Sequence, residues 1–230
     1  MRLIGAEILK LRRRRGMVVV CALLTVGAMA ILFAVRAVLG SPGHFDDAIG
    51  VLSMTAAVVG VIIGATAGGA DIEAGVFRDL AATGRSRIEL LLVRVPGAWA
   101  LLAPLLLAAA AIPVAIATPD AGTVVGSVAS VLAAGAVTST VCVGLAALTG
   151  SRGIVIGIAL AFQLGVSPLL AQIGALGDAR LAIPQVAVSR LSDAAGLTAE
   201  MGLGVAIAIL VAWSVAALAA GAWRTTTQEI

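Results

Sequence analysis

The sequence predicts an all-α integral membrane protein that crosses the bilayer six times. Of its 230 residues, 61% are hydrophobic and 12% are charged, and a soluble fold cannot cover that much apolar surface. The hydrophobic residues form six long runs, and one transmembrane helix needs ~20 residues. The charged residues concentrate between these runs. We therefore expect one transmembrane domain over residues 1–230, with an N-terminal interfacial helix, a polar segment between spans 2 and 3, and short helices between spans 5 and 6.

The first predicted span follows a basic segment, so a cleaved signal peptide is an alternative. Residues 28–30 read Ala-Met-Ala, which has the small-x-small form of a cleavage site. The apolar run continues past this position and further runs follow it, so we expect an uncleaved helix. The predicted spans are residues 17–39, 49–70, 88–117, 122–149, 153–173 and 201–223.

The third run is long for a span and contains three prolines. Pro96, Pro104 and Pro113 each remove a backbone donor, which predicts a kink or a break. Glu89 and Arg94 lie in its first turns. We expect both charged side chains to remain at the membrane interface by snorkelling.

Residues 1–16 are predicted to form an amphipathic helix at the membrane surface. Ile4, Ile8 and Leu11 recur at one-turn spacing and share one face. The basic end of such a helix favours contact with anionic lipid headgroups. A simple anchor that keeps the amino terminus in the cytoplasm is an equally good interpretation. The charged residues that define this helix are Glu7, Lys10, Arg12 and Arg13, followed by Arg14 and Arg15.

Residues 71–87 form a long polar interruption between two strongly apolar runs. Phe77, Leu80 and Ala81 recur at one-turn spacing, which predicts a short helix with an apolar face and a charged rim. Gly84 can end that helix, because glycine adopts the left-handed conformation without penalty. A helix held outside the membrane by two spans is suited to docking a partner. A solvated loop and a helix lying flat on lipid remain open alternatives.

The distribution of basic residues predicts that both termini lie in the cytoplasm. With the amino terminus inside, twelve basic residues lie on the cytoplasmic side or at its membrane edge, against Arg36, Arg180 and Arg190 outside. Cytoplasmic segments of multi-pass proteins carry such an excess. The opposite orientation would invert the ratio. Residues 71–87 are therefore also expected to face the cytoplasm.

Small residues recur every four positions in two of the runs, which predicts close contacts between helices. Packing within the bundle is the expected use, and a homodimer seam is the alternative. The two stripes are Gly60, Gly64 and Gly68 in the second run, and Gly157, Ala161 and Gly165 in the fifth.

The outer segment 174–200 is predicted to contain a short helix. Pro184 and Gly196 bracket it, because proline favours the start of a helix and glycine favours the position past its end.

Polar side chains within the fourth and fifth runs are candidates for a substrate pathway. Ser127, Ser130 and Thr138 share one helical face, and Gln163 is a strongly polar residue that must find a partner inside the bundle. Serine and threonine hydroxyls can also bond to the preceding backbone. Ordinary helix packing is therefore the alternative for this stripe.

The chain lacks the residues for several kinds of chemistry. It contains no G-x-x-x-x-G-K-[ST] phosphate loop and its single lysine is Lys10, so ATP hydrolysis would require another subunit. An intramembrane serine protease would have to recruit His44, the only histidine, from a turn outside the first span. Cys21 and Cys142 lie inside apolar runs and predict buried thiols. We expect no enzymatic activity, cofactor or metal in this chain.

A secondary transporter, a channel and a structural membrane anchor are the alternatives without an ATPase partner. Secondary transporters usually keep ionisable residues near the bilayer centre. None of the six runs has a carboxylate near its centre. This pattern favours a transporter whose energy arrives from outside the membrane domain. The few aromatic residues and the absence of buried charge favour a lipophilic substrate, such as a drug, an antibiotic or a lipid.

The N-terminal helix and the first half of residues 71–87 resemble the corresponding segments of ABC-2-type transporter permeases. These proteins begin with a short elbow helix that carries a glutamate and a basic cluster, and Glu7 and Lys10 occupy such positions here. In their cytoplasmic loop an acidic pair precedes a glycine. In this chain Asp71 and Glu73 stand before Gly75.

The second half of the same segment continues the resemblance. A Thr-Pro-x-Ser-Arg-like run leads into the next span of these permeases, and Thr83, Ser86 and Arg87 keep its spacing. The chain departs from the pattern at Gly84, where proline is usual, and at Val76, where threonine is common after the glycine. These departures concern the end of the short helix.

The resemblance implies a permease subunit of an ATP-driven exporter in a bacterial cell membrane. Residues 71–87 would form its coupling loop, and two such chains, identical or different, would work with two ATP-binding subunits that hold the ATP and Mg²⁺. Membrane lipid is the other expected partner, and no nucleic acid is expected. The residues implied for the ATPase interface are Asp71, Glu73, Gly75, Phe77, Arg78, Leu80 and Arg87.

Overall fold

The computed structural model describes residues 2–40, 45–76, 84, 86–191 and 201–227, and within these ranges the fold is helical with no strand. Six of the described helical segments are long and apolar enough to cross a membrane. The architecture is that of a multi-pass membrane protein, as predicted. The six segments are Arg15–Val38, Phe45–Glu73, Arg87–Ala117, Ala121–Thr149, Arg152–Leu170 and Leu203–Thr227.

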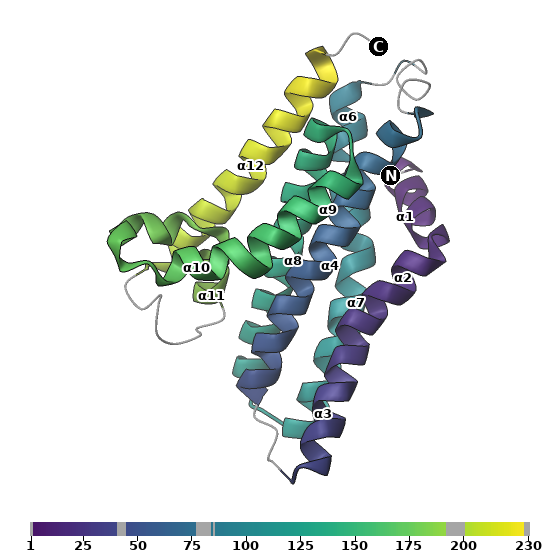
Figure 1. The fold of residues 1–230 in the computed structure, drawn as a ribbon. Helices are drawn as coiled ribbons and strands as arrows, with labels where there is room; N and C mark the ends of the chain where they lie inside the picture. Colours follow the sequence, from purple (N-terminus) through teal and green to yellow (C-terminus); the bar gives the residue numbers. More distant parts are fainter. Residues whose placement is uncertain (1, 41–44, 77–83, 85, 192–200, 228–230) are drawn as a thin grey trace.

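The first span follows a separate N-terminal helix, α1 (Arg2–Arg13), which meets it at an angle (Figure 1). The span consists of α2 (Arg15–Ala22), a π-helical turn η1 (Leu23–Gly27) and α3 (Ala28–Val38). Arg14 leaves helical geometry between α1 and α2, with a ψ of 65°. A helix is therefore present in the predicted region 1–16, and it ends at Arg13.

The centre of the bundle is the parallel pair α4 (Phe45–Glu73) and α8 (Ala121–Thr149). A Cβ at Gly60 would lie 2.8 Å from the Gly135 carbonyl oxygen, and one at Gly64 would lie 2.7 Å from Ser139 Cα. A Cβ at Gly68 would meet the α8 backbone in the same way. The helices approach this closely because no side chain separates them. The first predicted stripe thus packs within the bundle.

The third span contains the break expected from Pro96, whereas Pro104 and Pro113 do not interrupt it. It consists of α6 (Arg87–Leu92) and α7 (Arg94–Ala117), and Pro104 and Pro113 both lie inside the continuous α7. Val93 separates the two helices, three residues ahead of Pro96. The physical reason is that proline at position 96 cannot donate to the Leu92 carbonyl, so the helical ladder is interrupted there.

Local sequence signals explain several helix starts. Ser86 accepts a hydrogen bond from the Glu89 N–H at 3.0 Å and begins α6 with the Ser-x-x-Glu pattern of a capping box. Asp120 caps α8 by accepting from the Thr123 N–H at 2.9 Å. These hydrogen bonds satisfy backbone donors that have no partner within the helix.

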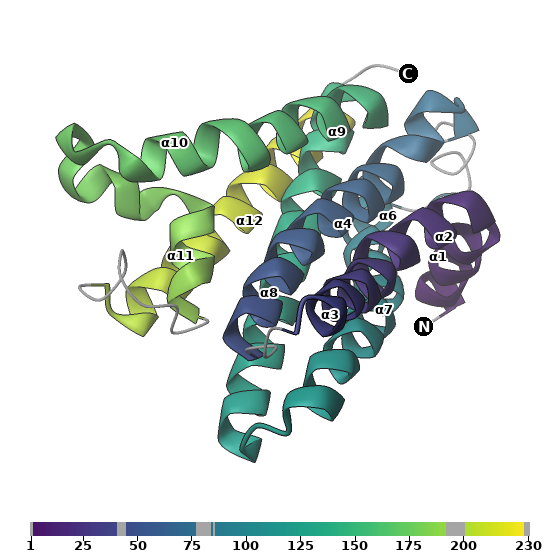
Figure 2. The same ribbon diagram turned by 60° about the horizontal axis from the view of Figure 1, so that its bottom comes forward.

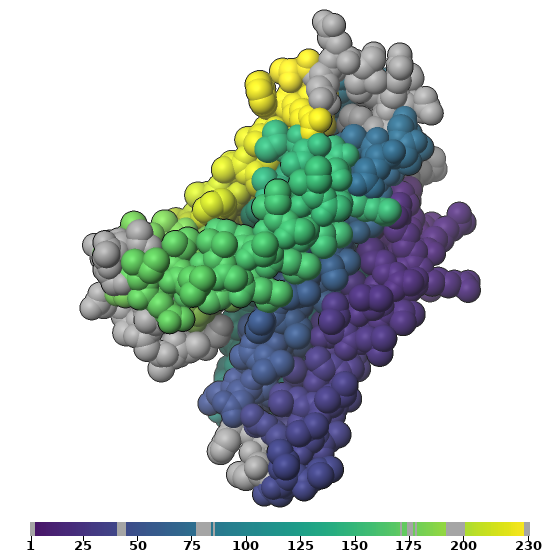
Figure 3. Space-filling view, viewed as in Figure 1, coloured from purple at the N-terminus to yellow at the C-terminus, as the bar shows by residue number. Residues whose placement is uncertain are grey.

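The last third of the chain packs on the central bundle through α9 and α12, and the segment between them, with α10 and α11, projects to one side (Figures 1 and 3). It leaves the bundle along the fifth span and returns through α11, which packs against both α8 and α12 (Figure 2). The predicted helix after Pro184 is present and extends to Leu191; the rest of that prediction, 192–196, lies outside the described residues. The elements are α9 (Arg152–Ala161), η2 (Phe162–Val166), α10 (Ser167–Gln172), η3 (Gly174–Ala182), α11 (Pro184–Leu191) and α12 (Leu203–Thr227).

Candidate functional site

Helices α1 and α6 and the last turn of α12 lie toward one end of the bundle (Figure 1), and charged residues at the helix ends there contact one another or neighbouring carbonyl groups. We call this the charged end. Its members come from the ends of helices that are far apart in the sequence, so the fold brings them together. The described members are Glu7, Lys10, Asp71, Glu73, Arg87, Glu89, Arg94, Arg152 and Arg224.

Asp71, in the last turn of α4, is the centre of an ion-pair cluster. Its Oδ2 lies 2.7 Å from Lys10 Nζ on α1 and 3.2 Å from Arg94 Nη2 on α7. Lys10 also pairs with Glu7 Oε2 at 2.6 Å. Arg94 donates through Nη1 to the Gly68 carbonyl at 2.6 Å. These contacts tie α1, α4 and α7 to one another.

Arg94 is the charged residue whose environment the sequence interpretation predicted incorrectly. Its side chain is 1% exposed and is enclosed by protein, whereas snorkelling to the membrane interface was expected. The carboxylate of Asp71 and the Gly68 carbonyl replace the water that the guanidinium loses, and an uncompensated buried charge would cost several kcal/mol. The signal in the sequence that could have predicted this ion pair was the presence of opposite charges, Asp71 and Arg94, at the two ends of one polar stretch.

Glu73, two residues after Asp71, links α4 to the turn between α8 and α9. Its Oε2 lies 3.0 Å from Arg152 Nε, and its Oε1 accepts from the Arg152 backbone N–H at 2.6 Å and from the Ser151 hydroxyl at 3.3 Å. Gly69 permits this approach, since a Cβ there would lie 2.9 Å from the Arg152 nitrogen. The α8–α9 turn is therefore held against the last turns of α4.

Two arginines connect α12 to the same end. Arg87 Nη1 donates to the Thr225 carbonyl at 2.9 Å. Arg224 donates to the Leu148 carbonyl in the last turn of α8. Gly150 ends α8 with a φ of +74°, and its lack of a side chain leaves room for the Arg224 guanidinium. A cation placed against the last carbonyls of a helix is favourable.

The residues predicted for an ATPase interface fall into four groups. Asp71 is buried and already ion-paired, so its carboxylate is not presented to a partner. Glu73 and Arg87 hold the neighbouring turns and helices, as described above. Gly75 has a φ of +70° where the chain leaves α4, a conformation that favours glycine. The predictions for Phe77, Arg78 and Leu80 lie outside the described residues.

Of the four charged residues predicted for the N-terminal helix, two face the bundle and two are exposed. Glu7 and Lys10 point toward α4 and α7, where a Cβ at Gly97 would come within 2.9 Å of Glu7 Cβ. Arg12 and Arg13 are exposed. Leu11, from the predicted apolar face, is fully buried. The helix therefore packs on the bundle through one face and leaves its basic end outside.

The predicted pathway residues do not form one surface. Ser130 is buried and donates to the Ser127 carbonyl at 2.7 Å, the backbone bonding that was the alternative interpretation. Thr138 packs beside Gly60 at the α4–α8 contact. Gln163 donates to Gln185 Oε1 on α11 at 2.5 Å, so it does find a partner in the protein.

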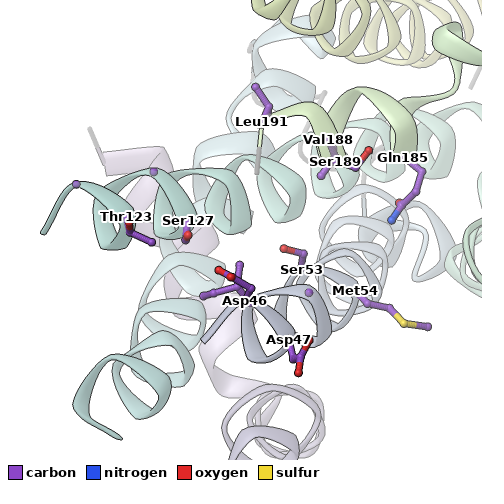
Figure 4. Close-up of a pocket in the computed structure, with 14 residues that line it drawn as sticks. Asp46, Asp47, Ser53, Met54, Thr123, Ser127, Gln185, Val188, Ser189 and Leu191 are labelled. Atoms are coloured by element: carbon purple, nitrogen blue, oxygen red, sulfur yellow. The ribbon is translucent and has the colours of Figure 1, made fainter. Parts of the chain in front are cut away.

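Ser127 lines a cavity at the end of the bundle opposite the charged end. This far-end cavity, of about 840 Å³, lies between the first turns of α4, the first turns of α8 and α11 (Figure 4). Gln185 also lines it, so Gln163 reaches the cavity wall through its partner. The polar side chains around it are Asp46, Asp47, Ser53, Thr123, Ser127, Gln185 and Ser189.

The described residues contain no group of three or more His, Cys, Asp or Glu side chains arranged to hold a metal ion. Cys21 and Cys142 are buried, free thiols in separate helices. No protein-family model matches the chain, and comparison with curated proteins finds no significant match.

Proposed function

We propose that this chain is the membrane permease subunit of an ATP-driven exporter of the ABC-2 type, driven by a separate ATP-binding subunit. The observation that supports the proposal is the set of contacts at the charged end. They connect the two flanks of residues 74–86, which contain the predicted docking segment, to α1, to the α8–α9 turn and to α12. A force applied to that segment would reach all these elements.

The Asp71–Arg94 contact is suited to mechanical coupling because it is short and both side chains are largely shielded from water. Asp71 lies at the start of the predicted coupling loop, residues 71–87, and Arg94 lies beyond its end at the start of α7, so their ion pair joins the second span to the third. Lys10 extends the same connection to α1. The glycine contacts between α4 and α8 would then carry a displacement into the fourth span. Closure of an ATPase dimer would in this way move several spans together.

The docking surface itself would combine apolar anchors with charges that set the register. Val76, at the start of the segment, is 43% exposed, and Phe77 and Leu80 follow it in the sequence. The excess of arginine at this end supports a cytoplasmic orientation with both termini inside. Two permease chains, identical or different, would bind two ATP-binding subunits in a bacterial cell membrane and export a lipophilic compound.

The main rival is a secondary transporter that uses the Asp71–Arg94 pair to handle protons or ions. The position of the pair favours coupling instead, because Asp71 lies in the last turns of its span rather than near the middle. The rival predicts transport by the purified chain with an ion gradient alone.

Co-purification tests the proposal. The tagged full-length chain is isolated from its native membrane in mild detergent, and partners are identified by mass spectrometry. We expect a chain that contains a G-x-x-x-x-G-K-[ST] phosphate loop. A Phe77→Asp substitution places a charge on the predicted apolar anchor and should remove that partner at unchanged expression of the permease.

Leu39→Asp is the matched control, because Leu39 is 71% exposed and directly follows α3, whose last turn lies at the opposite end of the bundle (Figure 1). It adds the same charge and should leave the partner bound. Recovery of the wild-type chain without any phosphate-loop protein, or equal recovery of that protein with Phe77→Asp, would overturn the proposal.

A further inference from the structure

The far-end cavity has the features of a ligand site built from three separate elements. Asp46 and Ser53 come from α4, Ser127 comes from α8, and Gln185 comes from α11 (Figure 4). The volume, about 840 Å³, falls within the range of small-molecule pockets. Several polar groups therefore converge on one space from helices that are not adjacent in the sequence.

Two ionisable side chains, Asp46 and Asp47, are among the described residues that line the cavity, and both are acidic. Asp47 is compensated, because its Oδ2 lies 3.0 Å from Arg36 Nη2. Asp46 forms no ion pair with any described residue, and among the described lining residues none is basic. Asp46 is also in the first turn of α4, where the helix dipole favours a carboxylate. Among the described residues, the cavity thus presents one exposed carboxylate, Asp46, that has no ion-pair partner.

Two hydrogen-bonding side chains, Ser53 and Gln185, also line the cavity. The Ser53 hydroxyl is shielded from solvent and has no hydrogen-bond partner among the described residues. A rotation about its Cα–Cβ bond toward a ligand would cost it no existing hydrogen bond. Gln185 is held from behind by Gln163, whose amide donates to its Oε1 at 2.5 Å. This contact orients the Gln185 side chain at the cavity wall.

The remaining wall is aliphatic. Ile49 and Met54 on α4 and Val188 and Leu191 on α11 line the cavity beside the polar groups. The Met54 side chain is flexible and polarisable, and it adapts to ligands of irregular shape. A ligand that satisfied both walls would carry a positive charge at one end and a hydrocarbon body at the other.

We propose that the far-end cavity binds an amphiphilic amine, with its ammonium group at Asp46 and its apolar part against Met54, Val188 and Leu191. As a substrate class this inference rests on the proposed exporter function, and it narrows the lipophilic substrate expected there to a cationic one. Binding itself is a property of this chain alone. It can therefore be tested without any ATPase partner.

The experiment uses the purified full-length chain in lipid nanodiscs and a fluorescent primary amine, dansylcadaverine. Its N-acetyl derivative is the neutral matched probe. We expect the wild-type protein to bind the amine at least ~5-fold more tightly than the acetylated probe, since a charge-assisted contact at a partly exposed site has about that effect. Asp46→Asn should abolish this preference. Glu89→Gln, which removes a carboxylate at the charged end, should retain it.

A second variant separates binding in the cavity from partition into lipid. Gly126 lines the cavity and a Cβ there would meet nothing within 4 Å, so Gly126→Leu can fill the space without distorting α8. It should lower the protein-dependent signal of both probes by ~5-fold or more. Equal binding of the two probes to the wild type, a preference that survives Asp46→Asn, or unchanged signals in Gly126→Leu would each overturn the inference. Co-purification of an ATP-binding subunit is a separate readout that none of these results affects.

Discussion

The two ends of the bundle are held together by different means. At the charged end Asp71 pairs with Lys10 and Arg94 at 2.7 Å and 3.2 Å, and Arg94 is 1% exposed. At the far end Arg36 and Asp47 pair at 3.0 Å, but the Asp47 side chain is 57% exposed. Water competes with the second pair and hardly reaches the first. We infer that the helices are firmly connected at the charged end. At the far end, which contains the cavity, they separate from one another more easily.

This difference has a direct consequence for a transporter. A partner that acts on the charged end would move helices that are already tied to one another. The response would be largest where the ties are weakest, around the far-end cavity. The α4–α8 contact at Gly60, Gly64 and Gly68 would be the pivot between the two ends, because it allows no side chain between the helices.

The largest expected effect follows from removing the central carboxylate at the charged end. Asp71→Asn leaves Arg94 buried without its ion pair, and breaking a buried pair costs about 3–5 kcal/mol. We expect a corresponding loss in the free energy of unfolding of the detergent-solubilised protein, measured by denaturant titration. A double Asp71→Asn/Arg94→Gln variant should recover part of it. A loss below ~1 kcal/mol would contradict the view that this end is firmly connected.

A smaller but still clear effect is expected at the pivot. Gly64→Val would force side-chain atoms into the Ser139 backbone, and overpacking of this kind costs about 1–3 kcal/mol. Thermal unfolding should show a lower Tm. Gly126→Ala is the control, because a Cβ there meets nothing within 4 Å, and its Tm should not fall. If both variants behaved alike, the α4–α8 contact would not be the close one described.

The same Asp-to-Asn change at the far end should have little effect. Asp47→Asn breaks the exposed pair with Arg36, and exposed pairs are worth about 0.2–1 kcal/mol. Measuring the free energy of unfolding of Asp47→Asn and Asp71→Asn by denaturant titration compares the two ends, because both variants replace an aspartate with an asparagine. A loss as large as that of Asp71→Asn would remove the distinction between them.

The smallest effect concerns pH. Hydrogen bonds from the Thr123 side chain and backbone lower the pKa of Asp120 below its ordinary value. A carboxyl group with a lowered folded-state pKa adds stability above its unfolded pKa, about 3.9, and loses it as the pH falls through the folded-state value. The Tm difference between wild type and Asp120→Ala should therefore shrink on acidification below pH ~4. A constant difference would show that the carboxylate charge plays no part in the cap.

Hydropathy and local signals were sufficient to predict the fold class. The span count follows from the length of the apolar runs. The break next to Pro96 was predicted, whereas the breaks or kinks expected at Pro104 and Pro113 do not interrupt α7. The helix caps at Ser86 and Asp120 were not predicted, although they too are local features of the sequence. These features depend on residues that are close together in the chain, so the sequence carries them directly.

The candidate site could be predicted only in part. Asp71 and Glu73 stood out as polar residues beside a span, but their partners lie up to 79 positions away and depend on tertiary packing. The two small-residue stripes looked equivalent. Gly64 meets a neighbouring helix, whereas a Cβ at Gly157 or Gly165 would meet no described atom within 4 Å. Which stripe is used depends on which helices become neighbours, and the pattern alone does not contain that information.

Site-specific photo-crosslinking at Val76 tests the central claim most directly. Val76 is exposed beside the predicted docking segment, and Leu39 is the matched exposed position at the far end. With a photo-reactive amino acid at each position in native membranes, the account predicts that a phosphate-loop protein crosslinks to residue 76 and not to residue 39. Crosslinking of such a protein at residue 39 instead, or labelling of a cysteine at position 76 from outside the cell, would contradict it.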